Sequence, residues 1–417
     1  MIVGTLLRFS RNVPLRAILF LVAVAVVVAS CGEESNVKKA PAPPVVAPED
    51  PPSNTKMVAE PWIVPPKNGA PAPAAVPATS AAPRFESAAQ CGSCHKAIYA
   101  EWKESWHGKA MVDPLFLRLS DGLKQEECIR CHAPVPLREM DNWETPIARN
   151  DRREDADSCL SCHQSGNGVA GPFETTGPCR PIKDDAQRDP IKICFACHNQ
   201  HKTGEEWLAG PYAPDAPAPR KTEAKSCLDC HMPWVDRPLV DGGPVRRGRV
   251  HSWPGGHSME QLKKAGKVDV ECKSVAAGTE IRTWLTNVGA GHNIPTDARH
   301  RSFDVYVKVW DASGKVVLDP LDPDPAAQER CHTLKARLNY RNSNKPDTQV
   351  PPLARMSKMG EWAGAITVPG VKSGRGEAWL VYRLTPEDAL VEASLSDPEF
   401  HAYRARRISV VEFTFGP

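Results

Sequence analysis

Five pentapeptides built on one pattern decide the fold of this 417-residue chain. In each, two residues separate a pair of cysteines, and a histidine directly follows the second cysteine. They read C-G-S-C-H at 91–95, C-I-R-C-H at 128–132, C-L-S-C-H at 159–163, C-F-A-C-H at 194–198 and C-L-D-C-H at 227–231. These motifs use ten of the 14 cysteines. They all fall between residues 91 and 231, so each repeat has only about 28 residues.

The spacing C-x-x-C-H is typical of covalent haem attachment. Two thiols one helical turn apart can each add to a vinyl group of one porphyrin, and the adjacent histidine then ligates the iron. A zinc site needs four ligands, usually from two cysteine pairs, and five pairs cannot be divided in that way. A thioredoxin-like pair occurs once, and a disulfide requires no histidine. The sequence therefore predicts five covalently bound haem c groups.

The predicted haem residues are ten thioether cysteines and five proximal iron ligands. The cysteines are Cys91, Cys94, Cys128, Cys131, Cys159, Cys162, Cys194, Cys197, Cys227 and Cys230. The proximal ligands are His95, His132, His163, His198 and His231. So short a stretch per haem cannot build a conventional apolar core. We therefore expect the porphyrins to fill the interior and to lie close together, with short helices and long loops around them.

Eight further histidines are candidates for the second axial position. We select His107, His201, His251, His257 and His292 as distal ligands, and interpret His300, His332 and His401 as structural or exposed. His107 follows an aromatic face at helical spacing and lies too far along the chain from His95 to reach the same iron. The segments around His257 and His292 contain glycines, which allow a close approach of the backbone.

Two segments resemble multihaem cytochromes of the cytochrome c-554 type, the superfamily that includes hydroxylamine oxidoreductase. The resemblance rests on Tyr99, Trp102 and the Trp106-His107 pair after the first motif, and on C-L-D-C-H-M-P at 227–233, and it covers roughly residues 88–300. It implies a haem domain joined to a β domain. After the Pro-Thr that follows His292, the family often has glycine, whereas this chain has Asp297.

Similar cytochromes commonly have a histidine between the third and fourth motifs, where this chain has Cys179. A free thiol, an axial thiolate and a five-coordinate iron all remain open there. For the remaining pair, Cys272 and Cys331, we expect a disulfide, which an oxidising compartment permits.

The N-terminus carries the features of a secretion signal. Three arginines precede an apolar run at 17–29, which is too short to span a bilayer. The run leads to Val28-Ala29-Ser30-Cys31, which resembles a bacterial lipobox. We expect residues 1–30 to be a lipoprotein signal peptide and Cys31 to be lipidated. The protein is then anchored outside the cytoplasm, at the outer membrane. Residues 31–87, rich in Pro and Ala, are expected to form an extended tether.

The rest of the chain divides into two expected domains, which make the fold class α+β. Residues 88–260 form a mostly helical and loop-rich pentahaem cytochrome c domain, and residues 261–417 a β-sandwich-like domain. Ser258 begins a capping sequence for a short helix. Alternating apolar residues then predict strands around 281–285, 303–309, 378–384 and 411–415.

Two functions remain in competition. Since 52 Lys and Arg are balanced by 50 Asp and Glu, no basic excess indicates nucleic acid. The favoured function is non-enzymatic electron transfer between redox partner proteins through closely packed haems of low potential. The alternative is a multihaem oxidoreductase that acts on a small nitrogen or sulfur compound at one open-coordinate haem. Pentahaem nitrite reductases usually mark their catalytic haem with a C-x-x-C-K motif, and none is present here. Homo-oligomerisation is left open.

Overall fold

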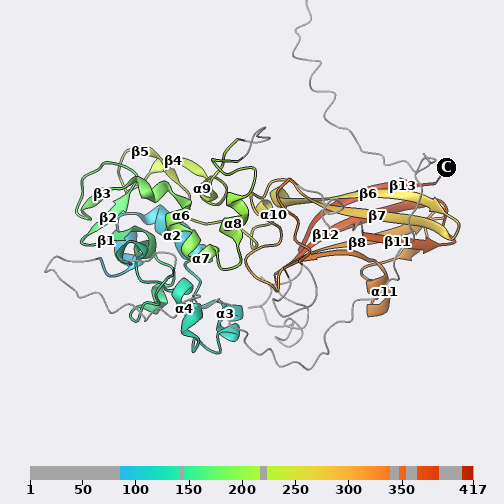
Figure 1. Ribbon diagram of the computed structural model, residues 1–417, viewed down its shortest axis with the longest axis horizontal. Helices are drawn as coiled ribbons and strands as arrows, with labels where there is room; N and C mark the ends of the chain where they lie inside the picture. The colour runs from blue at the N-terminus through green and yellow to red at the C-terminus, as the bar shows by residue number, and fades with distance from the viewer. Residues whose placement is uncertain are drawn as a thin grey trace, which may run out of the picture.

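The computed structural model describes residues 85–140, 145–216, 223–338, 347–353, 364–384 and 406–416. The expected signal peptide, Cys31, nearly all of the expected tether, and His401 lie outside these described residues. The fold is mixed α+β, as the sequence predicts. Short helices and small sheets form one end of the molecule, and two larger sheets form the other end (Figure 1).

The N-terminal part is built from helices of only four to nine residues. They are α1 (Ala88–Gly92), α2 (Lys96–Glu104), α3 (Pro114–Leu119), α4 (Glu126–His132), α5 (Cys159–His163), α6 (Pro190–Ile193), α7 (Phe195–His198), α8 (Thr203–Leu208) and α9 (Cys227–His231). Helices α4, α5, α7 and α9 each end at the histidine of a motif, whereas α1 ends inside the first motif. The motifs therefore carry their cysteines on single helical turns.

Serine caps start two of these turns directly before the first cysteine. Ser158 precedes α5 and exchanges hydrogen bonds with Ser161, and Ser226 does the same with Asp229 at the start of α9. Such a capping box satisfies two backbone N–H groups that a helix end leaves unpaired. A helix of five residues is unstable alone, so the caps fix where each motif turn begins.

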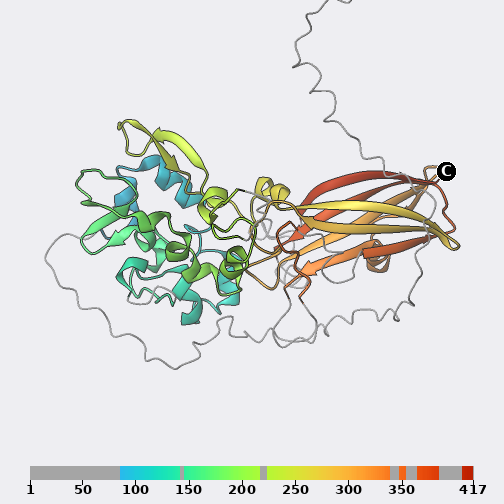
Figure 2. The same ribbon diagram turned by 45° about the horizontal axis from the view of Figure 1, so that its top comes forward.

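Two small sheets accompany the helices. The first has the order β1 (Gln164–Ser165), β2 (Gly168–Gly171) and β3 (Pro181–Lys183). The second is a hairpin of β4 (Trp234–Pro238) and β5 (Val245–Arg249), which lies at the outer edge of the N-terminal part in both views (Figures 1 and 2).

The C-terminal part consists of two antiparallel sheets. Its elements are α10 (Met259–Ala265), β6 (Gly266–Val275), β7 (Gly278–Asn287), β8 (Ser302–Asp311), β9 (Val316–Leu318), α11 (Pro325–Arg330), β10 (His332–Arg337), β11 (Gly364–Pro369), β12 (Gly374–Arg383) and β13 (Arg406–Phe415). One sheet has the order β10-β8-β12-β13, with β9 paired to β8, and the other has the order β11-β7-β6. The strands extend away from the N-terminal part (Figure 2).

Alternating apolar residues form the core between these sheets. Ile281 and Leu285 from β7 face Val305 and Val307 from β8, and all four are fully buried in one cluster of 21 residues. The strands thus lie where the alternation predicts them, and α10 follows its Ser258 cap. The expected Cys272–Cys331 disulfide is wrong, because both are free buried thiols. Cys272 lies on β6 and Cys331 precedes β10, in different sheets.

A buried aspartate ties β8 to its neighbours. Asp304 is 1% exposed and accepts hydrogen bonds from His332 Nε2 at 2.9 Å, Arg383 Nε at 3.2 Å and Ser302 Oγ at 2.6 Å. Burial alone would raise the pKa of Asp304. The hydrogen bond from His332 and the charges of Lys335 and Arg383 hold this pKa below its ordinary value.

We expect Asp304→Ala to lower the free energy of unfolding by about 3–5 kcal/mol at neutral pH, because it leaves Arg383 buried without its counter-charge. Since the folded-state pKa of Asp304 is depressed, this contribution is present above about pH 4 and disappears as pH falls through the folded pKa. Denaturant unfolding at several pH values measures both effects. Ser302→Ala removes only one hydrogen bond and serves as the control, with an expected loss of about 1 kcal/mol.

The two parts of the molecule meet at glycine-rich loops. A Cβ atom on Gly256 would lie 2.6 Å from the Tyr382 hydroxyl, and one on Gly210 would lie 2.8 Å from the Gly291 carbonyl oxygen. The loop of residues 288–301 leaves the sandwich after β7, and His292 and Asp297 on it line the cavity described below.

Candidate functional site

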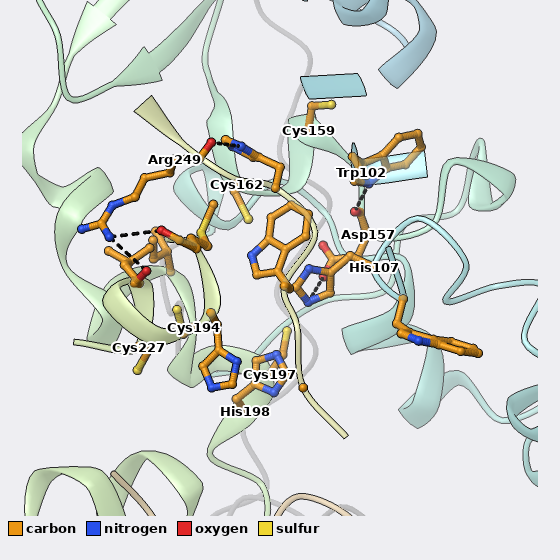
Figure 3. A pocket seen from close by; sticks show the side chains of 18 of the residues that line it. Trp102, His107, Asp157, Cys159, Cys162, Cys194, Cys197, His198, Cys227 and Arg249 are labelled. Atoms are coloured by element: carbon orange, nitrogen blue, oxygen red, sulfur yellow. Dashed lines mark hydrogen bonds and ion pairs between the residues drawn. The ribbon is translucent and has the colours of Figure 1, made fainter. Parts of the chain in front are cut away.

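One cavity of about 1660 Å³ occupies the N-terminal part and reaches the sandwich. Its walls include all ten motif cysteines and all five motif histidines. Sites for small ligands usually have volumes of about 300–1,000 Å³, so this space is larger than one such ligand needs. Figure 3 shows Cys159, Cys162, Cys194, Cys197 and Cys227 around its centre, together with His198.

Four motif histidines are held in one tautomer by backbone carbonyl groups. The Nδ1 atoms of His95, His132, His163 and His231 lie 2.6, 3.0, 2.7 and 2.7 Å from the carbonyl oxygens of Leu239, Ala110, Ala170 and Pro254. A carbonyl oxygen can only accept, so each Nδ1 carries the proton. The lone pair of each Nε2 is then available to a metal, which is how metal-binding imidazoles are usually oriented.

Three motif histidines face a second imidazole across the cavity. The ring centres are 6.0 Å apart for His107 and His198, 6.3 Å for His163 and His251, and 6.5 Å for His231 and His292. Two metal–nitrogen bonds of about 2 Å on opposite sides of one metal, with each ring nitrogen about 1 Å from its ring centre, give a separation of about 6 Å. Each pair thus has the spacing of two axial ligands to one iron.

Two of the second imidazoles are oriented like the motif histidines. His251 Nδ1 lies 2.9 Å from the carbonyl oxygen of Arg249, and His292 Nδ1 lies 2.8 Å from that of Asn293. Burial, together with the neighbouring imidazoles, lowers the pKa of His107 to about 3 and the pKa values of His231 and His251 to about 4. These rings are therefore neutral at physiological pH, the form in which histidine binds a metal.

A carboxyl group adjoins the first of these pairs. Asp157 Oδ2 lies 3.6 Å from His107 Nε2, and the Asp157 carbonyl accepts a hydrogen bond from Trp102 Nε1 at 2.8 Å (Figure 3). Burial raises the pKa of Asp157 to about 6, while the charge of His198 opposes the shift.

The other candidate histidines have different surroundings. His257 lines the cavity, and its ring stacks on Trp106 with the centres 3.6 Å apart. His201 also lines the cavity, and so does His300, which the sequence led us to interpret as structural or exposed. Both lie close enough to Asp297 for their charges to lower its pKa. The neighbourhood of His300 depends on how the 288–301 loop folds back, which residue spacing alone does not indicate.

The sequence leaves Cys179 without an assigned site, and the structure places it near the first motif. Its side chain lines the cavity, and its thiol is close enough to Cys91 and Cys94 for their charges to raise its pKa in addition to the effect of burial. Cys179 therefore lies near the first motif, although in the sequence it stands between the third and fourth.

Thiols of different motifs lie close to one another. Cys91 and Cys159, Cys131 and Cys197, and Cys194 and Cys227 are each near enough for one thiol to shift the pKa of the other. Cys162 lies near enough to Cys194 and Cys197 to affect their pKa values. The attachment points of the first and third motifs, the second and fourth, and the fourth and fifth are thus adjacent, and the third approaches the fourth.

Half-buried carboxylates hold the backbone at or beside two of the second imidazoles. Glu101 accepts the backbone N–H of His251 at 2.8 Å and pairs with Arg237. Glu206, on α8, accepts the backbone N–H of Asn293 at 3.0 Å and its side-chain amide at 2.9 Å. Sequence spacing gives no indication of these supports, because each links segments about 90 or more residues apart.

Burial raises the pKa of Glu206 to about 7, although hydrogen bonds from Asn293 and Thr296 oppose the shift. A raised folded-state pKa means that stability is complete below about pH 4.5 and is lost as pH rises through about 7. In Glu206→Gln, we expect the difference in free energy of unfolding between pH 5 and pH 8 to shrink by about 1–3 kcal/mol. Urea unfolding at the two pH values tests this. Glu205→Gln, on the exposed side of α8, should retain the full difference.

The residues present fit haem c. The cavity holds paired thiols one turn apart, proximal imidazoles with a free Nε2, and opposing imidazoles at the spacing of two axial ligands. Haem c accounts for these pairs of thiols and imidazoles. A site in which four such side chains bind a single metal ion is not required. In the described part of the chain, no helix combines the length and the apolar character needed to cross a bilayer.

Comparisons with known proteins agree with this donor set. Residues 90–164 match the family described as cytochrome c554 and c-prime. Cytochrome c-554 of Nitrosomonas europaea is 28% identical over 175 residues, which are 32% of this chain and 66% of that protein. The chain therefore spans slightly less than two thirds of that relative. The crystal structure of a penta-heme cytochrome c552 from Thermochromatium tepidum is 20% identical, with a TM-score of 0.55 over 79% of this chain and 98% of the other, which indicates a shared fold.

Proposed function

We propose that this chain, which is a multihaem c-type cytochrome, transfers electrons between redox partner proteins through a series of covalently bound haems. The family match, the relative and the shared fold confirm the resemblance drawn from the sequence. Haem c, when bound, supplies an iron that accepts and releases one electron at a time. The convergence of five motifs and three imidazole pairs on one cavity carries the proposal.

In this proposal the chain binds five haems, one for each motif. The ten motif cysteines form the thioether bonds, and the five motif histidines are the proximal ligands. His107, His251 and His292 are the distal ligands for the fourth, third and fifth motifs, because their rings face His198, His163 and His231. Two imidazoles keep the potential low, since the methionine ligand that raises it is absent from these pairs.

The proximity of motif thiols supports an order of electron transfer. The first motif adjoins the third, which approaches the fourth, and the fourth adjoins both the second and the fifth. We propose that electrons move along this order, and that the second motif is a branch rather than a step between the first and third.

The remaining sequence predictions belong to the same proposal. The mature protein is anchored outside the cytoplasm through lipidated Cys31 and is held away from the outer membrane by the tether of residues 31–87. Residues 88–260 form the pentahaem domain and residues 261–417 the β-sandwich-like domain. The two sheets and their buried core support the second assignment.

A mass measurement combined with electron paramagnetic resonance of the oxidised protein tests this proposal. We expect the mass of the polypeptide plus five haems, and low-spin signals from the three sites with opposing imidazoles. A protein that carries no haem, or in which all five irons are high-spin, would contradict it.

A second candidate function has one specific observation in its favour. Among the described residues, no second imidazole faces His95 or His132 at the spacing of the other three pairs, and the His132 ring instead stacks on Phe116 with the centres 3.6 Å apart. One of these sites could therefore keep an open position and act on a small nitrogen or sulfur compound. A stoichiometric high-spin signal that cyanide converts to low-spin would favour this oxidoreductase, and its absence would exclude it.

A further inference from the structure

Trp253 lies against the second imidazoles of two different motifs. The centre of its ring is 4.5 Å from that of His107 and 5.4 Å from that of His251, with angles of 69° and 87° between the ring planes. These are edge-to-face contacts, within the separation of about 4.5–7 Å at which aromatic rings attract one another. One indole thus contacts both the ring that faces the fourth motif and the ring that faces the third.

The backbone at Trp253 adopts a conformation that bulky residues rarely have. Its φ is 41°, in the left-handed region, where glycine fits without strain and a large side chain does not. Strained residues of this kind persist where the surrounding structure fixes them, and they cluster at functional sites. The conformation therefore supports a functional reason for the position of this indole.

The segment that carries Trp253 also holds the ligands of neighbouring sites. The carbonyl oxygen of Arg249 accepts from His251 Nδ1 at 2.9 Å, and the carbonyl oxygen of Pro254 accepts from His231 Nδ1 at 2.7 Å. His231 is the proximal ligand proposed for the fifth motif. This short segment therefore contacts ligands of the third, fourth and fifth motifs.

The indole joins the two motifs whose thiols influence each other least along the proposed order of electron transfer. Cys162 of the third motif affects the pKa values of Cys194 and Cys197 less than their partners in the second and fifth motifs do. In the proposed order, every electron from the first motif passes from the third to the fourth. Trp253 thus lies beside the step on which the whole route depends.

We propose that Trp253 is a positioning residue that couples the third and fourth haem sites, because its indole fixes the rings of His251 and His107 together. The inference rests on the proposed function. Axial ligation is one of the factors that set the potential of a haem. A displacement of one imidazole moves the indole and hence the other imidazole, so the reduction equilibria of the two haems depend on each other.

Substitutions of Trp253 in the haem-loaded full chain test the positioning role. W253L removes the aromatic rings, whereas W253F keeps one ring, which is too small to contact both imidazoles. We expect W253L to retain the haem content of the unmodified protein and to change the low-spin g values and the potentials of two haems together. W253F should change them less. H251A and H107A identify these two haems, because each converts one haem to high-spin.

The remaining haems are the internal control, since a general loosening of the interior would move their potentials as well. W310L is the matched variant. Trp310 lies on β8 and packs against Arg375 at 4.0 Å, away from the cavity walls. We expect W310L to leave every potential and g value unchanged. Equal changes at all haems in W253L, or the same changes in W310L, would overturn the role of Trp253.

A double-mutant cycle separates the indole from the charge interaction between the irons, which is present in both backgrounds. H251M should raise the potential of the third haem, and part of this change should be transmitted to the fourth. We expect the transmitted change in the reduction equilibrium constant to differ between the Trp253 and W253L backgrounds by about two- to thirty-fold, which is about 20–90 mV for a one-electron couple. Equal transmission in both backgrounds would show that the indole couples nothing.

The inference and the proposed function fail in different ways. If the unmodified protein carries haem and dithionite reduces it, but no Trp253 variant moves a potential or a g value, the role of Trp253 is wrong and the electron-transfer function is retained. If the unmodified protein carries no haem that dithionite can reduce, the electron-transfer function fails. If W253L does not acquire its haems, the same cycle is measured with W253F, in which transmission should also fall.

Discussion

When the chain is produced without haem attachment, helices α1 to α9 and the small sheets beside them are expected to lose their structure while α10 and strands β6 to β13 keep theirs. The N-terminal part has one apolar cluster of six buried residues, whereas the sandwich cluster has 21. Its helices contain four to nine residues, too few to be stable in water on their own. A cavity of about 1660 Å³ cannot stay empty in a close-packed interior.

Hydrogen exchange measured by mass spectrometry compares the two forms. In the haem-free chain, amides of α4, α5 and α9 should exchange at nearly the rate of an unfolded chain, while β7, β8 and β12 stay protected. The haem-loaded protein is the control, and both sets of amides should be protected in it. Persistent protection of the three motif helices without haem would show that the polypeptide, rather than the haem, organises this part.

His251→Met is expected to raise the potential of the haem bound by the third motif. The His251 ring faces His163 across 6.3 Å, and replacement of imidazole by a thioether favours the reduced iron. We expect a rise on the order of 0.1–0.3 V, within the range of about 0.8 V that axial ligands span. His251→Ala should instead convert one low-spin haem to high-spin. Spectroelectrochemical titration and electron paramagnetic resonance measure these changes.

His257→Ala supplies the comparison within the same loop. Its ring stacks on Trp106, and the ring that faces His163 at the spacing of a ligand pair is that of His251. We therefore expect the haem of the third motif to keep both its potential and its spin state. If His251→Met leaves every potential unchanged, the assignment of His251 to the third motif is wrong.

The motifs themselves could be recognised from the sequence because their chemistry is local. Two thiols and an imidazole within five residues act as one unit, and all five units line one cavity. The strands were predictable for a similar reason, since alternation along β7 and β8 reflects one buried face. The sequence also favoured His107, His251 and His292, whose rings face motif histidines in the structure.

The assignment of partners could not be predicted, because it depends on contacts between distant segments. His107 faces His198, 91 residues further along the chain, and nothing near either residue encodes that meeting. Glycine content made His257 look equivalent to His292, and in the structure His257 lines the cavity with its ring stacked on Trp106. The Cys272–Cys331 disulfide was expected only because two thiols remained, and in the structure both thiols are buried and free.

The position of Cys194 and Cys197 makes the fourth motif the branch point of the proposed order of electron transfer. Its two thiols lie near the second and fifth motifs, and the third motif approaches both. In that proposed order, loss of the fourth site would leave a first–third pair and two isolated sites. A chain that lost the first or the fifth site would keep the rest connected, so tolerance to sequence change should be lowest at 194–198 and higher toward the ends.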